Sequence, residues 1–372
     1  MLILAAVSLA LWLAALIVPW QPWRCRERLE PDDVHSSGDR EAAGFTVLIP
    51  ARNEAAVIGE TLSALRACAP DAPVVVVDDQ STDATCAVAC ESGLETLTLV
   101  RGTPPPAGWT GKLWALEQGL AHAASPWVLL LDADIRLAPG MLAALQHKAD
   151  EGYALASVCV EPCLSGTPAR WLLPAFVYFF KLLYPFRLAN RAGSRVAAAA
   201  GGVVWVDRQA LLDAGGFGAW RDAIIDDCTL AAHLKRRGHR CWIGLTHGAR
   251  SLRGSGFGDI AHMVARTAFV QLRESLPLLI LATVLLILAF WIPVLSVCTG
   301  GAMAHWLGGA AWLALIACYL PTLAYYRRNP FAAVLLPLTA TFFLAATWYS
   351  AWRALAGTRS VWKDRHYQRG AG

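Results

Sequence analysis

Hydrophobic residues follow two different patterns along the chain. Long uncharged apolar runs occur at residues 2–20, 276–299, 302–324 and 331–352. Between about residues 44 and 255, by contrast, the apolar residues form short runs separated by polar segments. A run of about 20 apolar residues can cross a bilayer as a helix, whereas short runs are typical of buried strands and of helices with one apolar face. We therefore expect a folded domain joined to membrane segments.

The first apolar run is followed, rather than preceded, by basic residues. Arg24, Arg26 and Arg28 lie just after it. A secretory signal peptide usually has basic residues before a shorter apolar core and ends at a cleavage site of small residues. Basic residues also mark the cytoplasmic side of a membrane helix. The sequence therefore predicts an uncleaved transmembrane anchor at residues 1–20, a linker at residues 21–43 and a cytoplasmic domain after them.

The C-terminal apolar runs predict transmembrane or re-entrant helices over residues 276–352. The first two runs suit a hairpin whose inner end carries Arg327 and Arg328. The third run contains Pro337 and leads into a basic tail at residues 353–372. If this run spans the membrane, the basic tail lies on the outer side, against the usual charge rule. A re-entrant or interfacial segment is the alternative, and both stay open.

A further apolar segment lies inside the folded domain. Residues 171–188 are rich in aromatic side chains and include Lys181 and Arg187. Such a segment forms either a core helix or a helix in the membrane interface, where basic side chains extend toward the headgroups. We expect the interfacial helix, and we expect residues 256–275 to form an amphipathic segment next to the membrane.

The domain at residues 44–255 alternates between strand and helix patterns. The short apolar runs predict strands at residues 45–49, 74–77, 97–100 and 127–131. Apolar residues at helical spacing between them predict helices at residues 55–68, 83–90 and 112–123. Strands that alternate with helices indicate an α/β fold with a mostly parallel sheet.

Composition narrows the classes of function. The chain is 56% hydrophobic and 16% charged, with a net charge of +4. This charge is too small to indicate nucleic acid as a partner, and no basic patch with interleaved aromatic residues accompanies it. The ten cysteines contain no CxxC pair, which argues against a zinc site and fits reduced thiols in a cytosolic domain.

Acidic residues collect where the expected strands end. Glu54 follows the first strand, Asp78 and Asp79 follow the second, and Asp132 and Asp134 follow the last. Ligands of such sheets bind beyond the carboxyl ends of the strands. Strand alternation places the last two carboxylates on the same side of the chain, and hard divalent cations prefer carboxylate oxygens. Capped turns would explain the same acids, so the residues alone leave both explanations open.

Six short motifs occur in a fixed order along the domain. They are IPARNE at 49–54, VVVVDDQSTDAT at 74–85, GKLWAL at 111–116, LLDAD at 130–134, GG at 201–202 and DDCTLA at 226–231. Together they resemble glycosyltransferase family 2, whose GT-A fold is a Rossmann-like α/β domain for nucleoside-diphosphate sugars. The N-terminal apolar run, GWTGK at 108–112 and WKDRHY at 362–367 further resemble the hopene-associated glycosyltransferases of bacterial membranes.

The resemblance implies a donor site at the strand ends. The implied ligands of the nucleotide sugar are Pro50, Arg52, Glu54, Asp78, Asp79, Lys112 and Asp132. Asp134, together with Asp132, is the implied ligand of a Mn2+ or Mg2+ ion that bridges the donor diphosphate. Gly111 would lie beside that diphosphate, although Lys112 could equally be a solvated lysine at a helix start. His247 is a candidate additional metal ligand, but a lone histidine is more often structural.

The resemblance also implies a catalytic base and an acceptor site. Asp227 would deprotonate the acceptor hydroxyl, and Asp226 stands where the family has a glutamate. Two adjacent carboxylates raise one another's pKa, which helps a base to act near neutral pH. Gly201 and Gly202 would lie near the acceptor. The alternatives are that Asp227 caps a helix starting at Cys228 and that the two glycines form a strand bulge.

The implied function is that of an inverting, multi-pass membrane glycosyltransferase on the cytoplasmic face of a bacterial inner membrane. It would move one sugar from a UDP-sugar or a similar donor to the hydroxyl of a lipid, in hopanoid or glycolipid synthesis. Gln271-Leu272-Arg273 does not match the Gln-x-x-Arg-Trp motif of processive members, which argues against polymer synthesis. Two alternatives remain, namely a polyprenyl-phosphate acceptor and a catalytically silent scaffold for membrane lipid synthesis.

Overall fold

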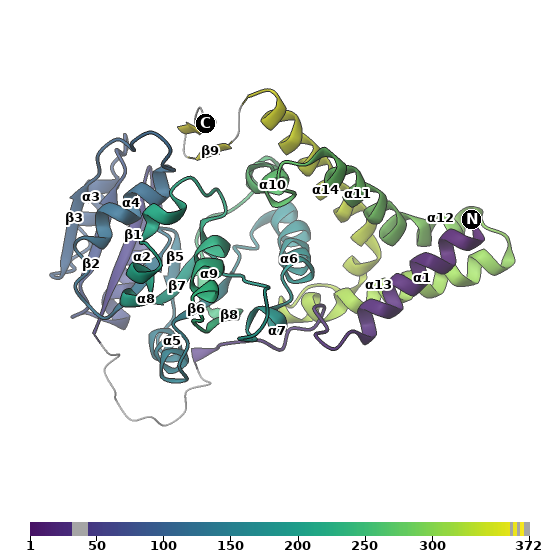
Figure 1. Cartoon of the computed structure of the whole chain (residues 1–372), viewed down its shortest axis with the longest axis horizontal. Coiled ribbons are helices and arrows are strands. Elements are labelled where there is room, and N and C mark those ends of the chain that lie inside the picture. The colour runs from purple at the N-terminus through teal and green to yellow at the C-terminus, as the bar shows by residue number, and fades with distance from the viewer. Residues whose placement is uncertain (32–43, 358–359, 363–364, 368–372) are drawn as a thin grey trace. The chain divides into compact units, whose positions relative to one another are not determined.

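Short buried strands and long apolar helices fall into separate parts of the structure. The computed structural model describes residues 1–31, 44–357, 360–362 and 365–367. We call the first part the sheet unit, which holds Glu27–Cys163, Leu188–Arg253 and the described part of Val361–Gly372. We call the second part the helical unit, which holds Met1–Arg26, Leu164–Arg187 and Gly254–Ser360. Figure 1 labels most of the elements of both units.

The sheet unit is built on an eight-stranded mixed sheet. The strands are β1 (Phe45–Ala51), β2 (Val74–Asp78), β3 (Leu97–Arg101), β4 (Trp127–Leu131), β5 (Ile135–Leu137), β6 (Leu155–Glu161), β7 (Val203–Asp207) and β8 (Cys241–Ser251). Their order in the sheet is β3-β2-β1-β4-β7-β6-β8-β5. The first four strands in this order are parallel, as the sequence predicted. The other half is mixed, because β7 is antiparallel to β4 and β6, and β5 is antiparallel to β8.

Helices cover both faces of this sheet. One face packs against α2 (Ile58–Cys68), α3 (Thr85–Cys90) and α5 (Met141–Asp150). The other face packs against α4 (Gly111–Leu120), α8 (Arg208–Asp213), the 3-10 helix η2 (Phe217–Trp220) and α9 (Asp226–Arg236). Every residue of β1 and β2 is buried, which explains why these strands appear in the sequence as continuous apolar runs.

Part of the predicted linker joins the sheet unit. Arg28 forms a parallel bridge with Leu245 of β8. The backbone N–H of Leu29 donates to the carbonyl of Leu245, and the N–H of Leu245 donates to the carbonyl of Glu27, both at 2.9 Å. Residues 32–43 of the predicted linker lie outside the described residues. The segment after the first helix is therefore fixed to β8 by backbone hydrogen bonds.

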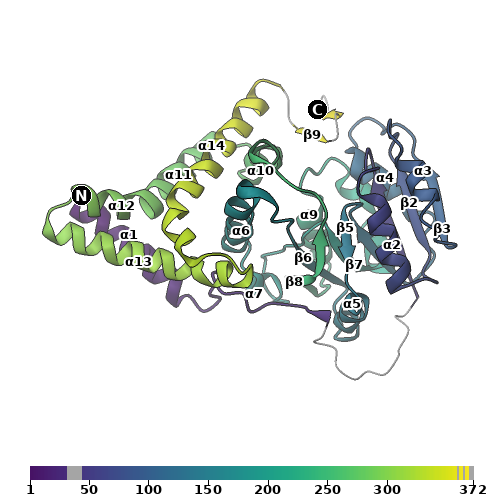
Figure 2. The ribbon, with the colours of Figure 1, turned by 180° about the vertical axis from the view of Figure 1, so that it is seen from behind.

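The helical unit contains the apolar helices that the sequence predicted. They are α1 (Leu2–Ile17), α6 (Gly166–Leu183), α10 (Phe257–Gln271), α11 (Leu276–Leu286), the π-helical turn η3 (Ile287–Trp291), α12 (Ile292–Thr299), α13 (Ala302–Tyr325), the 3-10 turn η4 (Pro330–Leu335) and α14 (Leu336–Leu355). The short helix α7 (Phe186–Ala189) follows α6, and β9 (Ser360–Trp362) pairs with β10 (Arg365–Tyr367). Figure 2 shows α1, α12 and α13 side by side.

Three segments of this unit are long and apolar enough to cross a membrane, among the residues described. They are Leu276–Thr299, Ala302–Tyr325 and Pro330–Leu355, in agreement with the three predicted C-terminal runs. The N-terminal helix α1 is apolar but has 16 residues, or about 24 Å, against about 30 Å for the hydrocarbon core of a bilayer. It ends at Ile17 because Pro19 disfavours the helical conformation of the residue before it.

The structure gives the surroundings of two residues in the apolar segments. Pro337 lies in the first turn of α14, where its missing N–H breaks no helical hydrogen bond, so it does not interrupt that helix. Lys181 does not extend toward a surface, because it is 2% exposed. Its ammonium group donates to the carbonyl of Arg24 and to the hydroxyl of Thr322, both at 3.2 Å.

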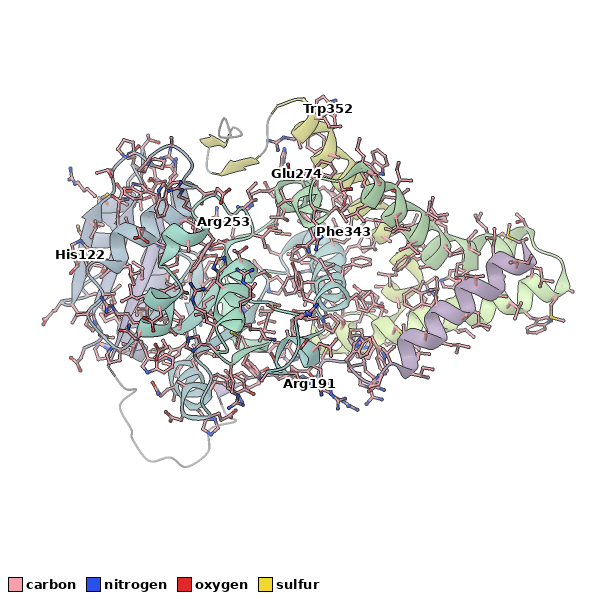
Figure 3. All side chains as sticks on the ribbon, viewed as in Figure 1. His122, Arg191, Arg253, Glu274, Phe343 and Trp352 are labelled. Carbon is pink, nitrogen blue, oxygen red and sulfur yellow. The ribbon has the colours of Figure 1, made fainter. Side chains whose placement is uncertain are left out.

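Helix α6 is therefore a core helix of the helical unit and not a helix lying on its surface. Leu172, Ala175 and Tyr178 are completely buried. The ring of Phe179 packs edge-on against Phe343 of α14 at a centroid distance of 5.5 Å (Figure 3). The interfacial position expected for residues 171–188 rested on two basic side chains reaching headgroups, and one of them satisfies its charge inside the protein instead.

Candidate active site

The loops after β1 and β2 are tied together at one edge of the sheet. The parallel register places Ala51 opposite Asp78. The backbone N–H of Asp79 donates to the carbonyl of Ala51 at 2.8 Å. The guanidinium group of Arg52 donates to the carbonyls of Asp79 at 2.6 Å and Gln80 at 3.2 Å. The candidate residues of these two motifs, which are distant in sequence, thus form one structural element.

The acids of this element are mostly buried. Asp78 and Glu54 are 7% and 8% exposed, and Asp79 is completely buried. A carboxylate oxygen of Asp78 accepts a hydrogen bond from the backbone N–H of Ser81 at 3.1 Å, so the turn-capping explanation holds for this residue. The backbone N–H of Glu54 donates to the hydroxyl of Thr85 at 2.8 Å. Hydrogen bonds between side chains and backbone thus hold the loops together.

A lysine joins the ends of three other elements. Lys112 lies in the first turn of α4, Asp132 follows β4, and Asp226 and Asp227 open α9. The Lys112 ammonium nitrogen is 2.9 Å from a carboxylate oxygen of Asp132 and 3.4 Å from one of Asp226. We call Lys112, Asp132, Asp226 and Asp227 the lysine cluster. Lys112 is therefore not a solvated surface lysine, since its side chain is 21% exposed.

The pKa values of Lys112 and Asp227 are both raised, for different reasons. Burial disfavours a charged Lys112, but the carboxylates of Asp132 and Asp226 outweigh it and raise the lysine pKa above its usual value. Burial raises the pKa of Asp227 to about 6, and the charge of Asp226 contributes to this rise against the opposing hydrogen bond from Cys228 and the charge of Lys112. The cluster thus holds a permanent cation beside a carboxyl group that titrates close to neutral pH.

Asp227 is held inside α9 rather than at its cap. The helix begins at Asp226, and its N-cap position is Ile225, which makes no side-chain cap. A carboxylate oxygen of Asp227 accepts from the backbone N–H of Cys228 at 2.7 Å. The capping alternative for Asp227, which placed the helix start at Cys228, is therefore wrong by two residues. Carboxylates in the first turn are favoured by the helix dipole, so this position offsets part of the cost of a charged Asp227.

The two glycines border the same cluster. A side-chain carbon added at Gly201 would lie 3.2 Å from an Asp227 oxygen and 3.3 Å from the Lys112 nitrogen. The carbonyl of Gly202 accepts a hydrogen bond from the backbone N–H of Asp132 at 3.1 Å. The first glycine therefore allows the backbone to approach the charged groups closely, and the second ties β7 to the acidic strand end.

A hollow with about 350 Å³ of empty space, part of which is open solvent, connects these groups. Its polar wall is the lysine cluster with Gly201, and Pro50 of β1 also lines it. Its apolar wall comes from β4, β7, α4, η2 and α9, and consists of Leu113, Leu116, Leu130, Leu131, Val204, Phe217, Trp220 and Leu230. A mostly apolar cavity with a few convergent charges is typical of a small-molecule site.

A second charged group surrounds Asp134. The hydroxyl of Ser251 donates to an Asp134 oxygen at 2.9 Å, and the Nε of Arg253 is 3.6 Å from the same oxygen. The Nη2 of Arg253 donates to a carboxylate oxygen of Glu54. We call Glu54, Asp134, Ser251 and Arg253 the arginine cluster. The sequence analysis missed Ser251 and Arg253, whose only signal is their place at the end of a long strand and just after it.

The acidic strand end suits a divalent metal that brings further ligands with it. Among the residues that the structure describes, no three His, Cys, Asp or Glu side chains group as a complete metal site. Asp132 and Asp134 supply hard carboxylate oxygens, and Mg2+ commonly binds to one or two carboxylates and to the phosphates of a substrate. The two carboxylates therefore fit a Mn2+ or Mg2+ ion that arrives with a diphosphate.

His247 is not part of this group. The register pairs Leu137 of β5 with Ala249 of β8 and Ile135 with Ser251. His247 therefore lies beyond the Leu137 end of β5, whereas Asp134 lies just before the other end. Its Nδ1 is 2.9 Å from a carboxylate oxygen of Glu30. The histidine thus has a structural partner at the far end of the strand, as the simpler explanation predicted.

Comparison with sequence families gives a match over more than half of the chain. The family described as "Glycosyltransferase like family 2" matches residues 42–263. This range contains the whole lysine cluster and the whole arginine cluster.

A curated relative matches a shorter stretch. The chain is 37% identical over 91 residues to the 4,4'-diaponeurosporenoate glycosyltransferase of Staphylococcus aureus (strain USA300). The match covers 24% of this chain and 24% of the relative. The chain therefore spans about a quarter of that relative's length at this level of similarity.

A solved structure is similar over almost the whole chain. The mannosyltransferase of Pyrobaculum calidifontis, in complex with GDP-Man and Mn2+, aligns with a TM-score of 0.54 and 20% sequence identity. The alignment covers 95% of this chain and 98% of that one. At this identity the likeness shows a shared fold, namely a GT-A-like mixed sheet together with further helices.

Proposed function

Because the chain belongs to glycosyltransferase family 2, whose members transfer a sugar from a nucleotide sugar, we propose that it moves a single sugar to the hydroxyl group of a lipid with inversion at the anomeric carbon. The observation that carries this proposal is the pair Asp226-Asp227 beside Lys112 in an open cavity. It brings a carboxyl group of raised pKa next to a fixed cation, at the edge of the sheet where donors bind in such folds.

The nucleoside half of the donor is proposed to lie against the loops after β1 and β2. Pro50 borders the cavity, and the backbone of the two loops is fixed by Arg52. Carboxylates accept hydrogen bonds from a uracil N–H and from ribose hydroxyls. Asp78 and Asp79 are buried. We propose that backbone groups of this loop contact the base, or that a small movement of the loop exposes the two carboxylates to it. A UDP-sugar is the proposed donor.

The diphosphate half is proposed to bind between the two charged clusters. The Lys112 ammonium group would form an ion pair with a phosphate oxygen in addition to its contacts with Asp132 and Asp226. Asp132 and Asp134 would hold the Mn2+ or Mg2+ ion. When bound, that ion acts as a Lewis acid, because it offsets the negative charge that develops on the departing nucleoside diphosphate.

Asp227 is the proposed general base. In the transfer step, its carboxylate accepts the proton of the acceptor hydroxyl as the oxygen attacks the anomeric carbon. The bond from this carbon to the donor phosphate oxygen breaks, and the nucleoside diphosphate leaves with the electron pair. A base with a pKa of about 6 is mostly ionised at neutral pH and can still accept a proton from the developing oxonium. One displacement of this kind inverts the anomeric centre.

The acceptor is proposed to be a membrane lipid. The chain has three helices long and apolar enough to cross a bilayer, among the residues that the structure describes, and many large apolar side chains of α11 are exposed. A relative of similar sequence over 91 residues is named as a glycosyltransferase for diaponeurosporenoate. We propose that the sheet unit works at the cytoplasmic face of a bacterial inner membrane, and that the product is a glycolipid, with hopanoids as one class of acceptor to test.

Mass spectrometry of membrane lipids tests this function directly. A strain that lacks the gene would be complemented with the wild type, with Asp227→Asn, or with Asp150→Asn as a surface control. We expect one glycolipid to disappear in the deletion strain and to return with the wild type and the control only. A lipid profile that does not change on deletion, or a full return with Asp227→Asn, would refute the proposed acceptor or the proposed base, respectively.

A further inference from the structure

Both acids of the Asp132-x-Asp134 motif face a cation from the chain itself. The Lys112 nitrogen lies 2.9 Å from Asp132, and the Arg253 Nε lies 3.6 Å from Asp134. The two cations reach the motif from different elements, since Lys112 opens α4 and Arg253 follows β8. A metal ion at this motif therefore has to compete with two internal counter-ions.

The Arg253 guanidinium bridges two acids that are more buried than itself. Its side chain is 46% exposed, whereas the side chains of Glu54 and Asp134 are 10% and 17% exposed. Burial disfavours its charge, but Glu54 and Asp134 outweigh this effect and raise its pKa, so it stays a cation at any physiological pH. Of these three side chains, the arginine has the most contact with solvent; Figure 3 labels it.

Arginine and a divalent cation make incompatible demands on Asp134. A metal ion binds a carboxylate oxygen at about 2.0–2.2 Å and repels a neighbouring positive charge. The oxygen of Asp134 that faces Arg253 also accepts the hydrogen bond of Ser251. This oxygen therefore has little remaining capacity to bind a metal ion. A bound diphosphate, by contrast, offers the arginine other oxygens to pair with. A guanidinium group can bind two phosphate oxygens at once in a planar geometry.

We propose that Arg253 is a positioning residue that covers Asp134 in the free protein and transfers its charge to the donor diphosphate when metal and nucleotide bind together. This inference rests on the proposed donor site. Glu54 keeps the guanidinium near the site in both states, because the Nη2 contact with Glu54 is separate from the Nε contact with Asp134. The exchange makes metal binding and nucleotide binding mutually dependent.

The alternative role for Arg253 is structural. Its contact with Glu54 ties the chain after β8 to the loop after β1, and its contact with Asp134 ties it to the turn between β4 and β5. Ion pairs of this kind can simply hold segments together. A structural role predicts that removing the arginine loosens the site and weakens every ligand. Exchange of counter-ions predicts the opposite for the metal alone, because removing the arginine uncovers Asp134.

Titration with Mn2+ distinguishes these roles. Full-length protein in detergent is titrated with Mn2+, with and without saturating UDP, and free Mn2+ is measured from its electron paramagnetic resonance signal. In the wild type we expect UDP to tighten Mn2+ binding by about 10-fold or more, a size typical of coupled sites. In Arg253→Gln we expect Mn2+ alone to bind roughly 3- to 10-fold more tightly and the coupling to fall to about 2- to 3-fold, as the loss of one exposed charge allows.

Two further variants complete the test. Arg253→Lys keeps the charge without the planar fork, so we expect it to restore weak binding of Mn2+ alone but only part of the coupling. Arg250→Gln removes an arginine of β8, three residues before Arg253, which pairs with Glu161 at 2.7 Å, and should match the wild type. Thermal melting of all variants shows that they are folded.

The outcomes separate this inference from the function that it depends on. If Arg253→Gln binds Mn2+ alone as weakly as the wild type, or more weakly, the counter-ion exchange is refuted while the donor site stands. The same holds if UDP tightens Mn2+ equally in both proteins. If the wild type binds neither UDP nor GDP at any Mn2+ concentration, both the inference and the proposed donor site fall.

Discussion

Replacing Asp227 with asparagine is expected to stop sugar transfer and, above pH 6, to stabilise the fold. Burial and Asp226 raise the pKa of Asp227 from 3.8 to about 6. A pKa that differs by one between the folded and unfolded chain corresponds to about 1.4 kcal/mol, so the ionised carboxylate lowers the free energy of unfolding by about 3 kcal/mol at most. Asparagine has nearly the same shape and can still accept the hydrogen bond from Cys228, while it carries no charge.

The sign of this effect depends on pH in a defined way. Above about pH 6 the group is ionised in both the folded and the unfolded chain, and the full cost is present. Below pH 3.8 it is protonated in both states, and the cost vanishes. The stability gained by Asp227→Asn should therefore be largest at pH 7–8 and should shrink as the pH falls through the window from 6 to 3.8.

Thermal unfolding of the full chain in detergent measures this difference. For a unit of about 200 residues, 1 kcal/mol moves the melting temperature by roughly 2–4 °C. We expect Asp227→Asn to melt several degrees above the wild type at pH 8 and closer to it at pH 5. Asp150→Asn makes the same change at the exposed end of α5 and reports the effect of the substitution itself. A lower melting temperature for Asp227→Asn at pH 8 would show that the carboxylate stabilises the fold, and would refute this account of the base.

Three further outcomes follow from the same cluster. The rate of transfer at low substrate should rise with pH up to about 6, the pKa of Asp227, and level off above it; a flat profile from pH 5 to 8 would contradict the assignment. Lys112→Met leaves Asp132 and Asp226 without the cation between them. Calorimetry should therefore find that UDP binds roughly 10- to 100-fold more weakly in the presence of Mn2+. Unchanged binding of UDP would contradict the role of the lysine. In Gly201→Ala the new side-chain carbon would lie 3.2 Å from an Asp227 oxygen, so kcat should fall by about 10-fold or more. The affinity for UDP should stay within about 2-fold of the wild type. Equal losses in kcat and in UDP affinity would contradict the placement of Gly201 beside the base.

The strand ends of the site could be predicted because burial leaves a clear pattern. β1, β2 and β4 are almost entirely buried, so each shows a run of apolar residues that stops abruptly at the polar residues of the site. In a parallel sheet these ends lie along one edge. The sequence could therefore place Asp78 and Asp132 at the same edge without any knowledge of the contacts between them.

The contacts across that edge could not be predicted. Lys112 and Asp226 meet because the first turns of α4 and α9 converge, and nothing in either segment specifies the other. Arg253 was missed for the same reason, since a single arginine after a strand looks like a solvated surface residue. Such pairings depend on the order β4-β7-β6-β8, which mixes parallel and antiparallel strands and has no local signal.

The local sequence did not reveal the surroundings of two residues in the apolar segments. Lys181 within an aromatic run is typical of a side chain that reaches headgroups, but it finds its partners at Arg24 and Thr322. Pro337 left open whether the third C-terminal run spans the membrane or is re-entrant, and in the structure it lies in the first turn of a helix that begins at Leu336. In both cases the missing information was the position of other chain segments, or of the helix start, relative to the residue.

A transfer assay with the purified full-length protein tests the central claim most directly. Wild type and Asp227→Asn are incubated with Mn2+, a panel of radiolabelled nucleotide sugars and a lipid extract, and binding of UDP is measured in parallel. We predict that the wild type transfers label from one donor to a lipid, and that Asp227→Asn binds UDP equally well but transfers at least about 100-fold more slowly, within the range that a general base contributes. Transfer by Asp227→Asn at the wild-type rate, or no transfer from any donor by a wild type that binds UDP, would contradict it.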